Sequence, residues 1–271
     1  KNKMTELDGD VSYIGLPTSV IHSLNFDQEV SRSAIGQPIG SFYAYKEDGL
    51  FQSEAEIKSY TNNKGELLQP NAKPGDIKFV DVNGDGVIDG NDRDYIGNPL
   101  PDVTAGLTLG VNFHNFDLSL FFQGMFGNDV YDLTRYVGDF YNQSQYNKNS
   151  RVVNAWTPTN TNTDIPRVTM DDPNNNIRPS SYYVQDASFV RLKNMKIGYS
   201  VPQSILSKIK FNSLYIYAQA TNLFTITGYD GIDPEVGLQS YSSDYRNLDM
   251  GVDRGIYPLS RTFTFGVNVS F

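Results

Sequence analysis

Val103-Thr-Ala-Gly-Leu-Thr-Leu-Gly-Val-Asn-Phe113, then His114-Asn115, then Phe116-Asp-Leu-Ser-Leu-Phe-Phe-Gln123, is the most informative stretch of this chain. In the first arm every odd position is apolar and every even position is Thr, Gly or Asn, which is the alternation of a β-strand with one apolar face. The parity of the apolar positions flips after the two-residue break. A two-residue hairpin that pairs Phe113 with Phe116 therefore puts both apolar rows on one side of a sheet.

Two architectures fit this hairpin. In a soluble sandwich the apolar face packs on a second sheet, and the other face is usually rich in charged side chains. Here the other face is small and mostly uncharged, as in the lining of a membrane barrel, and arms of about ten residues are long enough to cross the hydrocarbon at a tilt. The hairpin alone leaves both architectures open.

The composition favours an all-β chain and excludes several functions. The chain combines 18 Tyr, 16 Phe and 23 Gly with a mean hydropathy of −0.42, which suits alternating polar and apolar positions. Its net charge of −9 argues against nucleic-acid binding. It has no Cys, so disulfides and thiolate metal sites are excluded, and it has no apolar run of about 18 residues that would form a transmembrane helix.

The lengths of the connections decide between the two architectures. Strand patterns are predicted at 33–45, 103–113, 116–123, 184–201, 214–223 and 261–271. The connections between them are alternately long and short, which is the topology of an outer-membrane barrel and is not required of a sandwich. We therefore predict an antiparallel transmembrane β-barrel segment. The connections at 114–115 and 202–211 are expected in the periplasm, and those at 46–101, 127–183 and 224–258 are expected outside the cell.

Other segments carry weaker signals. Residues 1–32 form a lead-in without a clear pattern, and residues 33–271 are interpreted as one barrel region. A short helix is expected near 53–60, and a change of phase near Lys193-Asn194 indicates a β-bulge. Because the chain starts at Lys1 and six strands would leave two sheet edges in lipid, we expect it to be a piece of a longer protein with further strands upstream.

Several short motifs resemble one protein family in their order along the chain. They are Pro38-Ile-Gly-Ser-Phe-Tyr43, Pro74-Gly-Asp-Ile-Lys-Phe79, Asp81-Val-Asn-Gly-Asp-Gly-Val-Ile-Asp89, Tyr95-Ile-Gly-Asn-Pro99, Phe116-Asp-Leu-Ser-Leu-Phe-Phe-Gln-Gly124, Phe189-Val-Arg-Leu-Lys-Asn194, Ala220-Thr-Asn-Leu-Phe-Thr225 and the terminal Phe271. Together they resemble the C-terminal part of the barrel of SusC/RagA-family TonB-dependent transporters of Bacteroidetes.

The resemblance implies a 22-stranded outer-membrane barrel, plugged by an N-terminal domain and driven by the TonB complex. It implies a SusD-like surface lipoprotein as a lid and an oligosaccharide or a peptide as the cargo. The plug and the TonB contact would belong to a missing N-terminal part. Which of the two kinds of cargo is taken up is left open.

The segment 81–92 matches the template of an EF-hand calcium loop. The predicted ligands are Asp81, Asn83, Asp85, the carbonyl of Val87, Asp89 and Asp92, with Gly86 at the sharp turn. Asp92 stands where Glu is usual. No long amphipathic helices flank the loop, so a calcium ion would stiffen it rather than drive a sensor movement. The competing interpretation is an Asx-rich turn with solvated carboxylates.

Enzymatic activity is not expected, because the chain has no Cys nucleophile, no Gly-x-Ser-x-Gly motif and only two histidines. The candidate substrate contacts are Trp156, Tyr136, Tyr141, Arg191 and Lys193. The aromatic residues could instead pack the loop or meet the lid, and the two cations could form ion pairs. The acidic residues Asp230, Asp233 and Glu235 are expected to be solvated. The alternative function is a secreted, calcium-stabilised β-rich module that binds glycan or protein.

Overall fold

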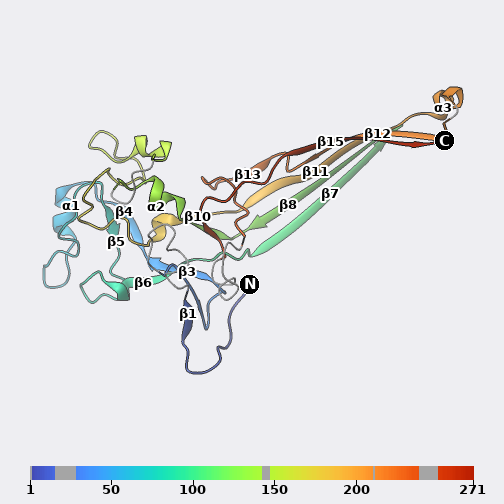
Figure 1. The fold of residues 1–271 in the computed structure, drawn as a ribbon. Helices are drawn as coiled ribbons and strands as arrows, with labels where there is room; N and C mark the ends of the chain where they lie inside the picture. The colour runs from blue at the N-terminus through green and yellow to red at the C-terminus, as the bar shows by residue number, and fades with distance from the viewer. Residues whose placement is uncertain (1, 16–28, 142–146, 210, 238–249) are drawn as a thin grey trace. The chain divides into compact units, whose positions relative to one another are not determined.

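The computed structural model describes residues 2–15, 29–141, 147–209, 211–237 and 250–271 and forms two compact units, with elements labelled in Figure 1. The first unit comprises Lys1–Leu100, Asp129–Gln185 and Val236–Gly255. The second comprises Pro101–Asn128, Asp186–Glu235 and Ile256–Phe271. The chain passes between the units several times. The division into a lead-in at 1–32 and a barrel region at 33–271 stays a prediction.

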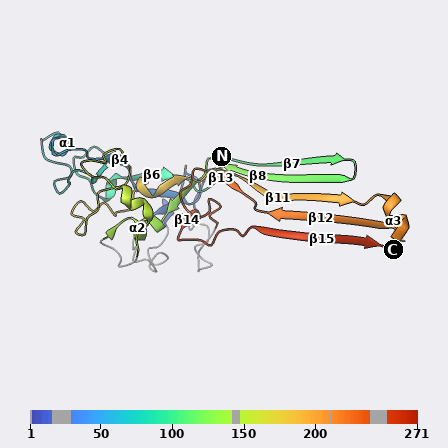
Figure 2. The ribbon, with the colours of Figure 1, turned by 90° about the horizontal axis from the view of Figure 1, so that it is seen from above.

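The second unit is a long antiparallel sheet. Its strands are β7 (Val103–Phe113), β8 (Phe116–Phe126), β11 (Phe189–Ser200), β12 (Ser213–Thr221), β15 (Thr262–Ser270) and the short β13 (Thr225–Thr227). They lie side by side in the order β7, β8, β11, β12, β15, and β13 pairs with one end of β11 (Figure 2). The sheet is open, because β7 and β15 each have one neighbouring strand among the described residues.

The predicted hairpin is confirmed in register. Phe113 pairs with Phe116 across His114-Asn115, and β8 continues three residues beyond Gln123. His114 has a φ of 53°, the left-handed backbone that so short a connection between twisted strands requires. The predicted bulge is also confirmed, because the pairing of β11 with β8 shifts between Leu192 and Asn194.

One face of the sheet is apolar across all five long strands. A single row of paired positions runs through Val111, Leu118, Ile197, Ala218 and Phe265. The side chains in this row are not covered at the sheet edges, since Val111 is 57% exposed and Phe265 is 81% exposed. Within the described residues, the second unit therefore presents an apolar face whose side chains are exposed at both edges of the sheet.

The opposite face is polar, and its glycines make room for tyrosine rings. Tyr217 of β12 is paired with Gly198 on one side and with Gly266 on the other. A Cβ atom placed on Gly266 would lie 2.2 Å from the ring of Tyr217. The ring can therefore lie flat over the neighbouring strand only because that position lacks a side chain.

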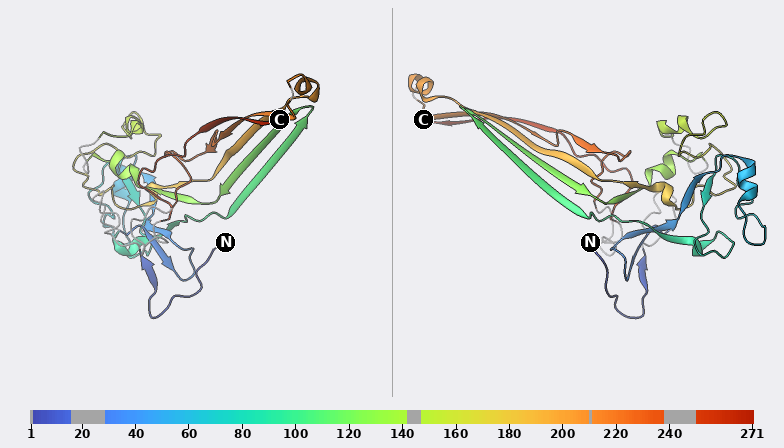
Figure 3. Two further views of the ribbon diagram at one scale, coloured as in Figure 1. Left: turned by 45° about the vertical axis from the view of Figure 1, so that its right-hand side comes forward. Right: turned by 180° about the vertical axis from the view of Figure 1, so that it is seen from behind.

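The two short connections lie at the same end of the sheet (Figure 3). The amide of Ser200, at the end of β11, donates to the carbonyl of Asn115 in the β7–β8 turn at 2.8 Å. The second short connection contains a helix that the sequence did not indicate, α3 (Gln203–Ile209). The longer connections leave from the other ends of the strands, as the alternation predicted.

The first unit contains short strands and helices. Its elements are β1 (Tyr13–Gly15), β2 (Ser31–Ala34), β3 (Ser41–Tyr45), β4 (Glu47–Leu50), α1 (Glu54–Ser59), β5 (Ile77–Phe79), η3 (Gly90–Asp92), β6 (Arg93–Gly97), β9 (Asp129–Asp132), α2 (Thr134–Gly138), η5 (Ser150–Asn154), η6 (Ser181–Tyr183), β10 (Val184–Asp186) and β14 (Val252–Asp253). They form sheets in the orders β1-β2-β3-β6, β10-β9-β14 and β4-β5. The pair β9 and β14 is parallel, whereas the pairs β1-β2, β2-β3, β3-β6 and β4-β5 are antiparallel.

The expectation that residues 33–45 supply a strand of this sheet is wrong. Residues 33–45 do not form a barrel strand, because Gly36 and Gly40 have positive φ values of 89° and 70° and turn the chain between β2 and β3. Both strands belong to the sheet β1-β2-β3-β6 of the first unit. The helix expected near 53–60 is confirmed, with the Ser53 side chain accepting a hydrogen bond from the Glu56 amide at the N-cap.

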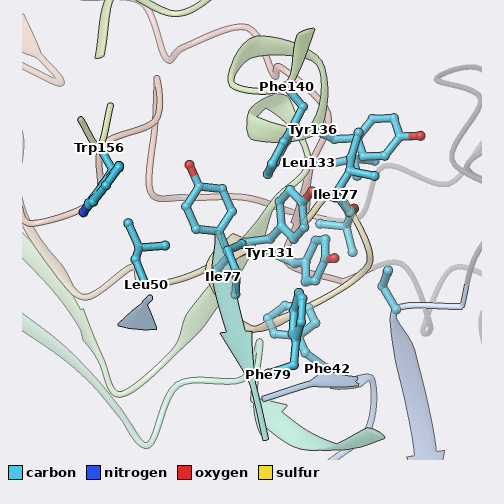
Figure 4. Close-up of a cluster of buried hydrophobic side chains, with 14 residues drawn as sticks. Phe42, Leu50, Ile77, Phe79, Tyr131, Leu133, Tyr136, Phe140, Trp156 and Ile177 are labelled. Carbon is cyan, nitrogen blue, oxygen red and sulfur yellow. Dashed lines mark hydrogen bonds between the residues drawn. The ribbon is translucent and has the colours of Figure 1, made fainter. Parts of the chain in front are cut away.

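The long polar segment 127–181 is not a structureless loop. It contains β9 and α2, and it supplies about half of the largest buried cluster, shown in Figure 4. Tyr131 stacks on Tyr183 with ring centroids 5.3 Å apart, and Phe42 packs against Tyr131 at 5.7 Å. Burial of several aromatic rings at 150–250 Å² each gives this unit a core of its own.

In the Asn-rich run at 171–176 the side chains of Asp172, Asn174 and Asn176 are buried, and the residues between them are exposed. Asn174 donates from Nδ2 to the carbonyl of Ile77, and Asn176 accepts from the Ile77 amide at 2.8 Å. Gln69 completes the arrangement by accepting from the Phe79 amide. Side chains of this run and of Gln69 therefore form the hydrogen bonds with the β5 backbone that a second neighbouring strand would otherwise form. Among the described residues no helix is long and apolar enough to span a membrane.

Candidate functional site

Arg191 of β11 is the centre of the clearest polar cluster in the second unit. Its Nε donates to Thr225 Oγ1 at 2.7 Å, its Nη2 to Asp233 Oδ1 at 2.6 Å and its Nη1 to Glu235 Oε2 at 3.0 Å. The side chain is 2% exposed, so its charge requires these carboxylates. Arg191 pairs with Gln123 of β8, which places it on the polar face of the sheet.

Asp233 is fixed from three directions. Its Oδ1 also accepts from the Glu235 amide at 2.9 Å, and its Oδ2 accepts from the Leu259 amide at 3.2 Å. Burial acts to raise the pKa of Asp233, but the hydrogen bonds from Glu235, Arg191 and Leu259 outweigh it and lower that pKa. Asp233 is therefore a charged residue that connects the 228–235 segment to β11 and to Leu259, which precedes β15.

Lys193 joins this cluster through Glu235. Its Nζ lies 2.8 Å from Glu235 Oε2, the oxygen that Arg191 also contacts. The ion-pair alternative for Arg191 and Lys193 thus describes the structure, although their partners come from a loop and not from a neighbouring strand. The expectation that Asp233 is solvated is wrong, since it is buried, whereas Asp230 is exposed as expected.

The three aromatic candidates lie in the first unit and are not part of this cluster. Trp156 and Tyr136 are buried in the cluster of Figure 4, and the Trp156 indole nitrogen donates to Gln52 Oε1 at 3.0 Å. Their position supports the packing alternative. Tyr141 is 37% exposed, with the ammonium of Lys148 5.2 Å from its ring centroid. Their role in binding a substrate stays a prediction.

The predicted calcium loop is a network of side-chain to backbone hydrogen bonds. Asp81 accepts from the amides of Gly84 and Gly86, at 2.7 and 2.8 Å. Asn83, Asp85 and Asp89 each accept from the amide two residues further on. These bonds fold the loop as the Asx-rich alternative described, and they orient its odd-numbered side chains.

Asp92 closes the loop from a buried position. It is 0% exposed and accepts from the amides of Val82 at 2.9 Å and Asp89 at 2.7 Å. Across the described ranges of the chain, no group of three or more His, Cys, Asp or Glu side chains is arranged to hold a metal ion. Calcium at Asp81, Asn83, Asp85, Val87, Asp89 and Asp92 stays a prediction.

A cavity in the first unit brings together carboxylates that the sequence did not single out. It has a volume of about 630 Å³ and is lined by residues 47–50, 52 and 161–164. Burial, and next the nearby charge of Asp164, raise the pKa of Glu47 to about 7. The sequence carries no signal for this site, because β4 and the 161–164 loop are more than a hundred residues apart.

Comparison with known proteins gives matches that extend over the whole length of this chain. TonB-dependent receptor P3 of Formosa agariphila is 37% identical over 272 residues, covering 100% of this chain and 26% of the receptor. TonB-dependent receptor SusC of Bacteroides thetaiotaomicron is 27% identical, covering 100% of this chain and 23% of the receptor. A solved structure of the RagAB peptide transporter matches with a TM-score of 0.68 at 23% identity, covering 98% of this chain and 25% of that one. The chain matches no protein-family model.

An antiparallel sheet with one apolar and one polar face, together with these matches, defines the class: TonB-dependent receptors, which reside in the outer membrane of Gram-negative bacteria. Within that class the chain corresponds to a part of a SusC/RagA-family receptor. It spans about a quarter of the length of the relatives it matches. The matched relatives are transport proteins, in agreement with the expectation that the chain is not an enzyme.

Proposed function

We propose that this chain is the C-terminal part of the barrel of an outer-membrane, TonB-dependent importer. The observation that carries the proposal is the five-stranded meander, in which one apolar row and one polar row continue in register from β7 to β15. Alternating lipid-facing and lumen-facing side chains are the requirement of a membrane barrel. The free edges of β7 and β15 would then pair with strands of the rest of the receptor, because lipid cannot satisfy them.

The proposed cargo of the whole receptor is an oligosaccharide or a peptide. RagAB is described as a peptide transporter, and SusC is described as a TonB-dependent receptor. By analogy we propose a SusD-like surface lipoprotein as the lid and the TonB complex as the energy source, reached through another part of the receptor. None of the named relatives supports the alternative of a secreted binding module.

We also propose that the 81–92 loop binds calcium as a structural ion. What supports this is the orientation of Asp81, Asn83 and Asp85 by hydrogen bonds from the loop's own backbone. In a medium with millimolar calcium even a weak site of this kind would be filled. The ion would stiffen the loop and would not take part in transport chemistry.

The barrel proposal is tested with two adjacent residues of β15 in the full receptor. This part of the chain has no cysteine, so single substitutions Phe265→Cys and Thr264→Cys give matched labelling sites on opposite faces. After spin labelling in native outer membranes, the label at 265 is expected to be relaxed by oxygen dissolved in lipid. The label at 264 is expected to be relaxed by a water-soluble nickel complex. Equal exposure of both labels to the water-soluble reagent would refute a lipid-facing sheet.

A further inference from the structure

A cavity of about 390 Å³ adjoins the Arg191 cluster within the second unit. Its lining combines an apolar wall with polar groups. The apolar members are Phe224, Ile232, Pro234, Pro258 and Leu259, and the polar members are Arg191, Asn222, Thr225, Thr227, Asp233 and Arg261. Such a mixture suits a ligand that carries one charged group next to an aliphatic one.

The carboxylates of the Arg191 cluster, of which Asp233 lines the cavity, already accept hydrogen bonds from other groups of the protein. Asp233 accepts hydrogen bonds from Arg191 and from two backbone amides, and Glu235 accepts from Arg191 and Lys193. A cation entering the cavity would have to displace an arginine or a lysine. The acidic residues therefore complete the protein's own structure and do not form a cation site.

Arg261, in contrast, brings a charge without a partner. It is exposed, it lines the cavity, and it forms no ion pair within the part of the chain that the structure describes. The charged groups of the cluster and its cavity are three cations, Arg191, Lys193 and Arg261, and two carboxylates, Asp233 and Glu235. The local excess of positive charge thus resides on a guanidinium, which binds carboxylates with two parallel hydrogen bonds.

The register of the sheet shows which face the cavity adjoins. Arg191 pairs with Thr225 of β13 and with Gln123 of β8, so all three lie on the polar face. In the proposed barrel the polar face is the lumen, through which the cargo moves. This step rests on the proposed function, because only a barrel makes this face a transport path.

We infer that this cavity binds a carboxylate of the cargo, with Arg261 as the charged contact and the apolar wall receiving the group next to it. A peptide C-terminus and a uronic acid both supply a carboxylate. The apolar wall favours the peptide, because Leu259, Ile232 and Phe224 match an aliphatic side chain better than a hydroxylated ring. The buried Arg191 cluster positions this wall by holding the 228–235 and 256–261 segments together.

The test uses the full receptor with its lipoprotein partner, purified in detergent, and four probes. Two are copies of one short peptide with an aliphatic last residue, ending in a free acid or an amide. The others are a uronate-terminated oligosaccharide and its neutral counterpart. Equilibrium binding is measured for the wild type and for Arg261→Gln, Arg261→Lys and, as a control on an exposed lysine of α3, Lys208→Gln.

The wild type is expected to prefer the acid peptide over the amide by on the order of tenfold, the size of one charge-assisted contact. Arg261→Gln is expected to abolish this preference while still binding the amide peptide, which shows that the variant is folded. Arg261→Lys should keep part of it, and Lys208→Gln should keep all of it. A preference for the uronate alone would assign the carboxylate to a sugar.

Equal binding of acid and neutral probes by the wild type would overturn the inference, as would an unchanged preference in Arg261→Gln. In either case, uptake of the probes by cells that carry the receptor would leave the proposed importer intact. Absence of uptake of every peptide and oligosaccharide, with the receptor outside the outer membrane, would instead refute the proposed function itself.

Discussion

Asn176 donates a hydrogen bond from Nδ2 to Oδ1 of Asp76 at 3.0 Å, across 100 residues of sequence. Both side chains are buried, and the same Asp76 oxygen accepts from Arg167 Nε at 2.6 Å. The carboxylate therefore connects the start of β5 to two separate points of the 165–177 segment. This contact explains why a run that reads as a solvated loop packs inside the first unit.

Replacing the buried carboxylate should destabilise the first unit strongly. Asp76→Ala leaves the Asn176 amide and the Arg167 guanidinium without their acceptor, and breaking a buried ion pair costs about 3–5 kcal/mol. We expect a protease to cleave the Asp76→Ala variant of the full receptor within residues 62–75 at a lower temperature than it cleaves the wild type. The matched control is Asp48→Ala, which removes a 2.8 Å pair with Lys78 at a carboxylate that is 64% exposed. That loss should stay below about 1 kcal/mol, so equal losses would contradict this account.

The five long strands of the sheet were predictable because the patterns that indicate them lie within short stretches of the sequence. An alternation of period two fixes the face of each side chain, and the two-residue turn at His114-Asn115 fixes the register. The pairing of β11 with β12 crosses a short connection, whereas the pairs β8–β11 and β12–β15 join strands that long connections separate. The contribution of residues 33–45 was mistaken, because two glycines with positive φ turn a run that reads as one strand. The predicted strand 184–201 was too long at its start, because residues 184–186 form β10 in another sheet.

The first unit and the partners of Arg191 could not be predicted in the same way. Whether a polar side chain can be buried depends on the partner that it meets in the fold. For Arg191 that partner, Asp233, lies 42 residues away in the sequence. The sequence indicated that Arg191 could form an ion pair, but it did not select the carboxylate, because 31 acidic residues were available. The same reasoning applies to Trp156, because an aromatic residue in a polar segment reads equally as a contact for ligand or as core.

A test of the polar face compares two glycines. Gly266→Ala would place a Cβ atom 2.2 Å from the Tyr217 ring, whereas a Cβ on Gly110 of β7 meets nothing within 4 Å. Overpacking of this kind costs about 1–3 kcal/mol. Gly266→Ala is therefore expected to lower the temperature at which the receptor unfolds, followed as the loss of the fast-migrating folded band on a gel. Gly110→Ala is expected to leave that temperature unchanged.

Adding Tyr217→Ser to Gly266→Ala should recover most of that loss, because the smaller side chain frees the space. A double variant that melts no higher than Gly266→Ala would show that the ring is not the cause.

Glu47 should make the first unit sensitive to pH. Its pKa in the folded protein is about 7, above the ordinary value of 4.5, so the folded state holds the proton more tightly than the unfolded state. The stability that the protonated form provides is complete below about pH 4.5 and is lost as the pH rises through 7. Glu47→Gln should then be nearly neutral at about pH 4.5 and stabilising by about 1–2 kcal/mol at pH 8, allowing for solvent screening. The measurement is the denaturation midpoint of the full receptor at both values, and a gain of the same size at both would contradict the assignment.

Two aspartates of the 81–92 loop should respond differently to calcium. Asp92 is buried and closes the loop through the amides of Val82 and Asp89, so Asp92→Ala is expected to make the loop sensitive to protease with or without calcium. Asp85 is exposed and accepts from the Val87 amide and the Asn83 side chain, both within the loop, so Asp85→Ala is expected to remove the protection that calcium adds and little else. Protease cleavage at the loop, followed in the full receptor with millimolar calcium or with a chelator, separates the two effects. If the wild type is cleaved at the same rate in both conditions, the loop is held by its own hydrogen bonds and the calcium proposal fails.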